Sequence, residues 1–246
     1  MSAKALITIH YSREERRAAS YLLSLLSALQ SELSDLADVL VYPGYGVEAP
    51  PQHTLDALQQ AFGRVEVRSA TRPLPPQENL DKAAERVDTL NLRLGDLLFE
   101  VGANFSEYKA VVALGVHACP ITRDWLSVIL GEWDASEPAF LGAWSPRNML
   151  MGNPTDALGF LVERALIFRP DVIKHHHGLR NTPRRHSWAM YHAPSMKDMG
   201  WQGTYAIRSL PETYHITPEA IQQLRDEHVV LIHGVRDDSA RRIVHP

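Results

Sequence analysis

Imidazole and guanidinium side chains stand where apolar runs of this sequence stop, and their chemistry suits a phosphate or a metal ion. The last such place is the stretch HGVRDDSAR, which follows the apolar run 229–232. His233, the flexible Gly234 and Arg236 would emerge together there, at the end of a strand. Imidazole is a common metal ligand, and guanidinium binds phosphate oxygens well. The alternative interpretation is an ordinary polar C-terminal tail.

Two further polar segments follow apolar runs in the same way. The residues after the run 5–9 are His10, Tyr11, Ser12 and Arg13. Gly115-Val116-His117 follows the run 108–114. Because ligands of parallel α/β sheets bind at the carboxyl ends of strands, we expect all three segments to cluster at one edge of one sheet. The first segment has an equal alternative as a capped turn, since Ser12 and Glu15 have the spacing of a capping box.

The elements that must position these segments alternate along the chain. The patterns predict strands at 5–9, 38–42, 65–68, 108–114, 139–144 and 229–232. They predict helices at 13–33, 54–62, 79–101, 122–130, 155–168 and 218–228. Prolines make 69–78 a loop, 145–153 reads as a second loop, and 169–188 is polar without strong periodicity. Alternating strands and helices predict an α/β fold with a mostly parallel central sheet flanked by helices, and with an irregular second half.

Length and composition favour one continuous domain over 1–246, with a first half at 1–120 and a second at 121–246. The chain has 246 residues, 45% of them hydrophobic, which suffices for a sizeable core. Its net charge of −4 gives no global attraction to nucleic acid or acidic membranes. The single cysteine, Cys119, excludes an intrachain disulfide and a Cys-rich zinc site. With no signal-peptide pattern and no apolar run long enough to span a bilayer, we expect a cytoplasmic location.

The segment 169–188 carries the one local basic patch. Its cations are Lys174, Arg180, Arg184 and Arg185, which could meet a nucleic-acid backbone. The three adjacent histidines at 175–177 point in different directions on any regular element, so a solvated loop is a better interpretation of them than a metal site.

Several familiar nucleotide and hydrolase motifs are absent. The sequence has no GxxxxGK[ST] loop, no GxGxxG after the first strand and no GxSxG elbow. The order of HYSREER, a helix with Lys82, Arg86 and Asn91, VVALGVHACPIT, FLGAWSPRNMLMGN and a terminal HGVRDDSAR instead resembles GT-A type nucleotide-sugar glycosyltransferases. The resemblance covers most of the chain and is strongest at the C-terminal stretch.

The resemblance implies a metal and diphosphate site with an altered ligand set. In this family a terminal histidine, followed by glycine and a cation, serves the metal and the diphosphate, which gives those roles to His233 and Arg236. Where the family has Asp-x-Asp, this chain has Gly115 and His117. Either His117 and His233 hold a divalent metal, Mn or Mg, with imidazole suiting Mn, Zn or Fe better than Mg, or Arg236 and other cations act without metal. The third possibility is a lost activity.

The resemblance also assigns the two substrates. The donor would be a nucleoside diphosphate sugar, a UDP-sugar above all, carrying a hexose or pentose. Its nucleotide would lie against His10, Tyr11, Ser12, Arg13, Arg86 and Asn91. A hydroxyl acceptor, either a glycan or a hydroxylated base in DNA, would lie near Trp144, Gly152, Asn153 and Trp188. Candidates for the catalytic base are His186, His192 and Asp198, because a base must reach the acceptor hydroxyl. The alternative is a non-catalytic nucleotide- or glycan-binding module on the same fold.

Overall fold

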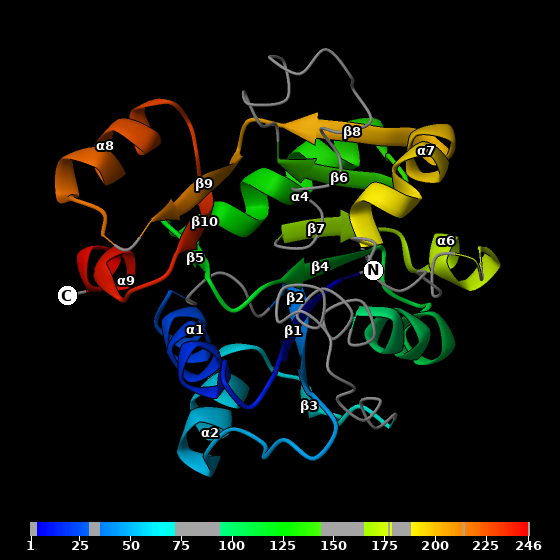
Figure 1. Cartoon of the computed structure of the whole chain (residues 1–246), viewed down its shortest axis with the longest axis horizontal. Coiled ribbons are helices and arrows are strands. Elements are labelled where there is room, and N and C mark those ends of the chain that lie inside the picture. Colours follow the sequence, from blue (N-terminus) through cyan, green and yellow to red (C-terminus); the bar gives the residue numbers. More distant parts are fainter. Residues whose placement is uncertain are drawn as a thin grey trace, which may run out of the picture.

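The computed structural model describes residues 4–29, 35–71, 94–143, 165–176, 178, 188–213 and 215–245. Its centre is a seven-stranded sheet with the order β3-β2-β1-β4-β7-β6-β8 (Figure 1). The strands are β1 (Ala5–Tyr11), β2 (Ala37–Pro43), β3 (Val65–Val67), β4 (Ala110–Leu114), β6 (Phe140–Ala143), β7 (Ala165–Phe168) and β8 (Trp201–Thr204). All neighbours pair in parallel except at β7, which is antiparallel to β4 and β6. The predicted mostly parallel α/β sheet is confirmed.

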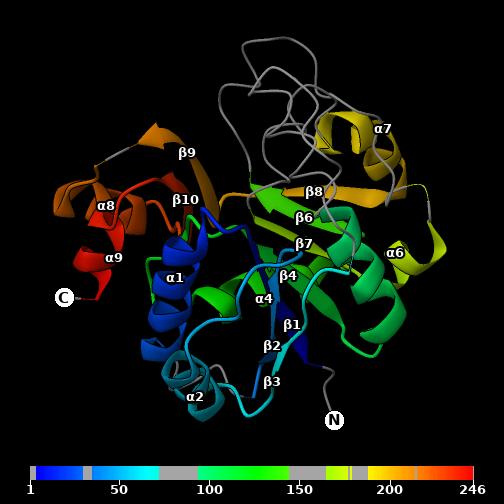
Figure 2. The same cartoon turned by 60° about the horizontal axis from the view of Figure 1, so that its bottom comes forward.

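Helices cover both faces of this sheet (Figure 2). One face packs against α1 (Arg16–Ala28), α2 (Gln52–Ala61) and α4 (Trp125–Ser136). The other packs against the helix at 94–104, α6 (Pro170–His175) and α7 (Trp188–Gly200). Strand β1 shows why its sequence is an unbroken apolar run: Ile7 and Ile9 face the first layer, and Leu6 faces the second. A strand buried on both faces has no polar side to alternate.

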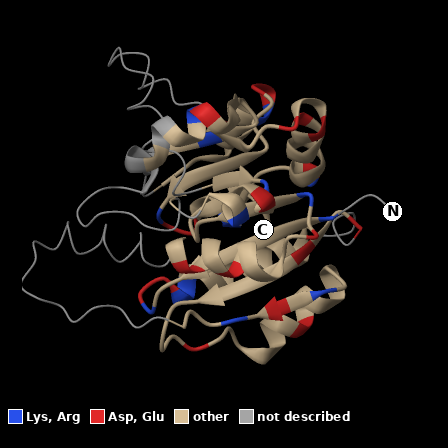
Figure 3. Ribbon diagram, turned by 90° about the vertical axis from the view of Figure 1, so that its right-hand side faces the viewer, with Lys and Arg blue, Asp and Glu red and all other residues tan. Residues whose placement is uncertain are grey.

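Charged residues lie mainly on the outer helices and turns, and the strands carry few (Figure 3). None of the helices in the described ranges is long and apolar enough to cross a bilayer. The division at residue 120 stays a prediction, and the central sheet takes strands from both sides of it.

A second, three-stranded sheet lies beside the carboxyl ends of β1 and β4. It has the order β5-β10-β9, with β5 (Ala118–Pro120), β9 (Ile207–Thr213) and β10 (Leu231–Val235). Residues of α8 (Pro218–Asp226) and α9 (Ser239–Val244) complete its apolar cluster. The prediction that His233 ends a strand of the central sheet is therefore wrong. One of the two partners of β10 is β5, a short segment that lies directly after His117 and that the sequence patterns did not single out as a strand.

Strand β7 corrects a second prediction. The sequence pattern predicts a helix through 155–168, but Ala165–Phe168 form a strand between β4 and β6. All four side chains are buried, and a short apolar run flanked by polar residues fits a central strand as well as a helix end. The residues at 155–164 lie outside the described ranges.

Other helices also differ from the predicted bounds. Helix α1 begins at Arg16 and not at residue 13, because Ser12 and Glu15 close a separate turn before it. Helix α4 begins at Trp125 and runs to Ser136, beyond the predicted 122–130. The polar segment after residue 168 contains the short helix α6, which starts with Pro170. Helix α8 begins after Thr217 as predicted, and the Thr217 hydroxyl accepts a hydrogen bond from the Ala220 amide at 3.3 Å.

Gly234 is the residue that lets β10 run alongside β9. Its φ is +112°, and the pairing of the two strands shifts register between His233 and Val235. A Cβ added at this position would lie 2.4 Å from the Leu210 carbonyl oxygen, a backbone atom that cannot move aside cheaply. The backbone at Gly234 therefore depends on the absence of a side chain.

We expect Gly234→Ala to lower the free energy of unfolding by about 3 kcal/mol, because both the φ angle and the Leu210 contact oppose a side chain. Gly131→Ala is the matched control. Gly131 lies in α4 with open space where a Cβ would stand, so alanine there should stabilise by about 0.5–1 kcal/mol. Urea unfolding followed by circular dichroism measures both. Equal stability of the Gly234 variant and the wild type would contradict the strain at this position.

Cys119 gives a chemical probe of the small sheet. It lies in β5 and is 2% exposed, and burial raises the pKa of its thiol from 9.0 to about 12. The folded state therefore favours the protonated thiol of Cys119. The stability that this thiol contributes is complete below about pH 9 and is lost as the pH rises towards 12.

We therefore expect iodoacetamide to label the native protein slowly at about pH 8 and the urea-unfolded protein rapidly, since the thiolate is the nucleophile. Between about pH 8 and 10.5, the wild type should lose more stability than Cys119→Ala, which lacks the titrating group. Both proteins contain the same buried tyrosines, so subtracting one pH dependence of stability from the other removes the contribution of the tyrosines. Rapid labelling of the native chain would show that β5 is not buried as described.

Candidate functional site

The carboxyl ends of β1 and β4 lie next to each other in the central sheet. Ile9 of β1 is opposite Leu114 of β4, so His10 and Gly115 are the residues that come next on each strand. His10 is 6% exposed and sits on the face of β1 opposite to Ile9. Two of the three predicted segments are therefore neighbours at one sheet edge.

The third segment, which begins at His233, lies beside the other two because β10 pairs with β5 in the small sheet. His233 of β10 is opposite Ala118 of β5, the residue directly after His117. The rings of His117 and His233 lie with their centroids 6.3 Å apart and an interplanar angle of 79°. His233 is 6% exposed and His117 is half-buried. Two imidazoles separated by more than a hundred residues of sequence thus meet beside the end of β4.

The turn after β1 uses the side chains of two predicted ligand-binding residues for its own structure. Tyr11 is buried in the core; its hydroxyl donates to the Glu48 carbonyl at 3.0 Å, and burial raises the pKa of this phenol to about 12. The Ser12 amide and hydroxyl both donate to the Glu15 carboxylate at 2.9 Å. Arg13 is exposed. Of the four residues at this strand end, His10 and Arg13 have side chains that these contacts do not use.

Arg241 is a residue of the C-terminal stretch whose role the sequence did not reveal. It lies in α9, and its Nη2 donates to the carbonyl oxygen of Val116 at 2.5 Å. Val116 stands between Gly115 and His117, so α9 holds the backbone of the loop that carries His117. The sequence showed Arg241 within HGVRDDSAR, but not which distant carbonyl it would bind. Arg236, the predicted diphosphate ligand, is exposed directly after β10.

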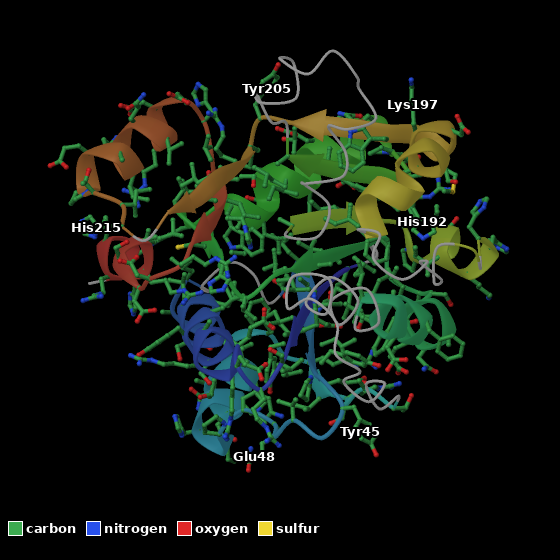
Figure 4. The ribbon with its side chains drawn as sticks, viewed as in Figure 1. Tyr45, Glu48, His192, Lys197, Tyr205 and His215 are labelled. Atoms are coloured by element: carbon green, nitrogen blue, oxygen red, sulfur yellow. The ribbon has the colours of Figure 1, made fainter. Side chains whose placement is uncertain are left out.

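The other candidates fall into two groups. Those outside the described residues are Arg86, Asn91, Trp144, Gly152, Asn153 and His186. Helix α7 carries the rest: Trp188 begins it, the side chain of His192 is 4% exposed, and Asp198 is exposed near its end. Figure 4 shows His192 on the side of the molecule away from the small sheet. In the described part of the chain, neither His192 nor Asp198 joins the two imidazoles in a three-ligand metal site.

The imidazoles that meet beside the ends of β1 and β4 offer nitrogen ligands. Among the described residues, no group of three or more histidine, cysteine, aspartate or glutamate side chains is placed to hold a metal ion. His117 and His233 could supply two imidazole ligands to a divalent ion, which would then complete its coordination with ligand or solvent oxygens. An exposed guanidinium at Arg236 adds positive charge where an anion could be bound.

Comparison with known proteins adds the fold family. No family model matches the chain, and no curated protein sequence does so either. Among solved structures, the chain is similar to xyloside xylosyltransferase 1 from mouse, with a TM-score of 0.52 and 10% identity over 95% of this chain and 98% of that one. It is similar to the galactosyltransferase LgtC, solved with donor and acceptor sugar analogues, with a TM-score of 0.55 and 9% identity over 97% and 93%.

A third similar structure is WbbM, a bifunctional glycosyltransferase. Its TM-score is 0.56 with 8% identity, and the match covers 95% of this chain and 46% of that chain. Identities this low establish the architecture and leave the activity to be argued from the site. The chain therefore has the fold of GT-A type glycosyltransferases.

Proposed function

We propose that this protein is a glycosyltransferase that moves a sugar from a nucleoside diphosphate sugar, a UDP-sugar, to a hydroxyl acceptor. The observation that carries the proposal is the meeting of His117 and His233 beside the carboxyl ends of β1 and β4. A sheet edge of this kind is where α/β folds bind nucleotides. The GT-A fold of the neighbouring structures supports the same class of reaction.

The donor would lie against three segments at the sheet edge. His10 and Arg13 would lie against the nucleotide, and Arg236 would pair with the diphosphate, whose charge grows as the sugar leaves. His117 and His233 would hold a divalent metal, Mn or Mg, with Mn better suited to imidazole. When bound, such an ion neutralises charge on the diphosphate leaving group. Arg241 would keep the backbone before His117 in place through Val116.

The acceptor side rests on residues outside the described ranges. Trp144, Gly152 and Asn153 would contact the acceptor together with Trp188 at the start of α7. The base that takes the acceptor proton is sought among His186, His192 and Asp198. His186 lies outside the described residues, and His192 and Asp198 lie on α7, so all three stay candidates for this role.

A second candidate function is a non-catalytic module that binds a nucleotide or glycan. The observation that favours it is the pair Gly115 and His117, which stand where the family has two metal-binding carboxylates. The module would use the same sheet edge for binding and would lack turnover.

We expect UDP with Mn to raise the melting temperature of the protein by about 5–10 °C at concentrations about a hundredfold above Kd, because a ligand that binds only the folded state stabilises it. The screen includes GDP, CMP and TDP, each with and without Mn. His233→Ala should remove the Mn-dependent part of the shift, and His53→Ala, an exposed histidine of α2, should not. No shift with any nucleotide would sink the donor assignment.

The pH dependence of that shift tests the metal ligands. An imidazole binds a metal ion only in its neutral form. The Mn-dependent shift should therefore be larger at about pH 8 than at about pH 5.5, on either side of the ordinary histidine pKa. A shift with UDP that is independent of Mn at both pH values would instead indicate a metal-free site built on Arg236.

Turnover and salt dependence separate the remaining alternatives. Release of UDP together with a glycosylated acceptor is expected for the transferase. Nucleotide binding without cleavage of the UDP-sugar is expected for the module, and release of both UDP and free sugar, with no glycosylated acceptor, for a hydrolase. A DNA acceptor should bind much more weakly as salt rises from about 50 to 200 mM, whereas a neutral glycan should respond little. Nucleotide binding in the absence of turnover with several sugars and acceptors, with or without Mn, would favour the module.

A further inference from the structure

A cavity lies between α1 and α9, on the outer side of the small sheet. Both Figure 1 and Figure 2 show the two helices next to each other near the C-terminus. Its volume is about 450 Å³, within the range of about 300–1,000 Å³ typical of small-molecule sites. Its charged and aromatic lining residues include Arg17, Tyr21, Asp238, Arg241, Arg242 and His245. None of them belongs to the proposed donor-binding set.

The charge of the cavity is opposite to that of the protein. Three arginines face one aspartate, an excess of two positive charges before His245 is counted, in a chain whose net charge is −4. Arg241 is the buried member: its side chain is 12% exposed, and burial lowers the pKa of its guanidinium. Asp238 is 3.5 Å from its Nη1. A charge this deeply buried needs a nearby anion, and the single, partly exposed carboxylate of Asp238 supplies only part of that compensation.

The ring of Tyr21 lies close to the guanidinium groups of both Arg17 and Arg241. The Arg17 Nε and Nη2 donate to its hydroxyl at 3.1 and 2.9 Å, and the Arg17 guanidinium carbon lies 5.3 Å from the ring centroid. The guanidinium carbon of Arg241 lies 6.0 Å from the same centroid. Two like charges held beside one aromatic ring repel each other, so an anion close to both would be bound favourably.

The ligand class follows from the donors. Guanidinium groups present several N–H donors in a planar fork that matches the oxygens of a phosphate. A dianionic phosphate would balance the excess of two positive charges, and Tyr21 with Leu25 offers an apolar wall to an organic substituent. We propose that the cavity between α1 and α9 is a second ligand site, which binds a phosphate group, either as inorganic phosphate or as a phosphate monoester.

The site is separate from the imidazole pair but touches the same loop. Arg241 lines the cavity and also binds the Val116 carbonyl, one residue before His117. A phosphate in the cavity would therefore meet the side chain that holds that loop. The test must show that the phosphate occupies this cavity and not the edge of the central sheet.

Isothermal titration calorimetry of the full chain, at constant ionic strength set with chloride, measures binding of inorganic phosphate and of glycerol 1-phosphate. We expect saturable binding to the wild type and affinity at least about tenfold weaker in Arg17→Gln/Arg242→Gln, which removes two exposed cations of the cavity. Lys197→Gln is the control, because it removes one charge from the exposed surface of α7, far from α9 (Figure 4). Circular dichroism checks that the variants fold.

A second variant separates this site from the donor site. His117→Ala/His233→Ala should bind phosphate as the wild type does, so failure of the donor assignment leaves this proposal standing. Tighter binding of the monoester than of inorganic phosphate would indicate an organic ligand, and equal binding would indicate recognition of the phosphate alone. Absence of saturable binding, unchanged affinity in the arginine variant, or loss of binding in the histidine variant would each overturn the proposal.

Discussion

The pairing of β10 with β5 is the constraint on which the candidate site depends. It joins residues that are far apart in sequence, with His233 opposite Ala118, and so brings His117 and His233 together. Without this pairing the two imidazoles would not be held side by side. On its other side β10 lies against β9, and at Gly234 it passes the Leu210 carbonyl too closely for a side chain. The glycine after the histidine is thus a requirement of backbone packing.

The C-terminal region holds the segment around β5 from both sides. Arg241 binds the Val116 carbonyl before β5, and the Nε of Arg225 donates to the Ile121 carbonyl after it at 2.8 Å. The Ile121 amide donates to the Val230 carbonyl at 2.8 Å. Between these points run the ladder bonds of β5 with β10. Charge-assisted hydrogen bonds to backbone carbonyls therefore clamp the loop on which His117 stands, so its position is set by the fold.

The sequence predicted those parts of the fold that depend on local pattern. The strands β1, β2 and β4 could be predicted because burial on both faces requires an unbroken apolar run. The start of α8 could be predicted because a capping residue directly precedes a helix. Strand β7 could not, since its short run is compatible with a helix end and its state is decided by the strands on either side. The pairing of β5 with β10 is likewise non-local. No pattern within three residues predicts a partner more than a hundred positions away.

The candidate site shows the same limit in its chemistry. The sequence named both His117 and His233, since each follows an apolar run, but not that they would meet through a second sheet. It also offered Tyr11 and Ser12 as ligands for a nucleotide, whereas the first is buried with its hydroxyl on the Glu48 carbonyl and the second is bound to Glu15. Residue type and position along a strand could not distinguish a side chain that faces a ligand from one that completes a turn. That distinction depends on which groups the folded chain brings within hydrogen-bonding distance. At this strand end, the hydroxyls of Tyr11 and Ser12 both form hydrogen bonds within the protein.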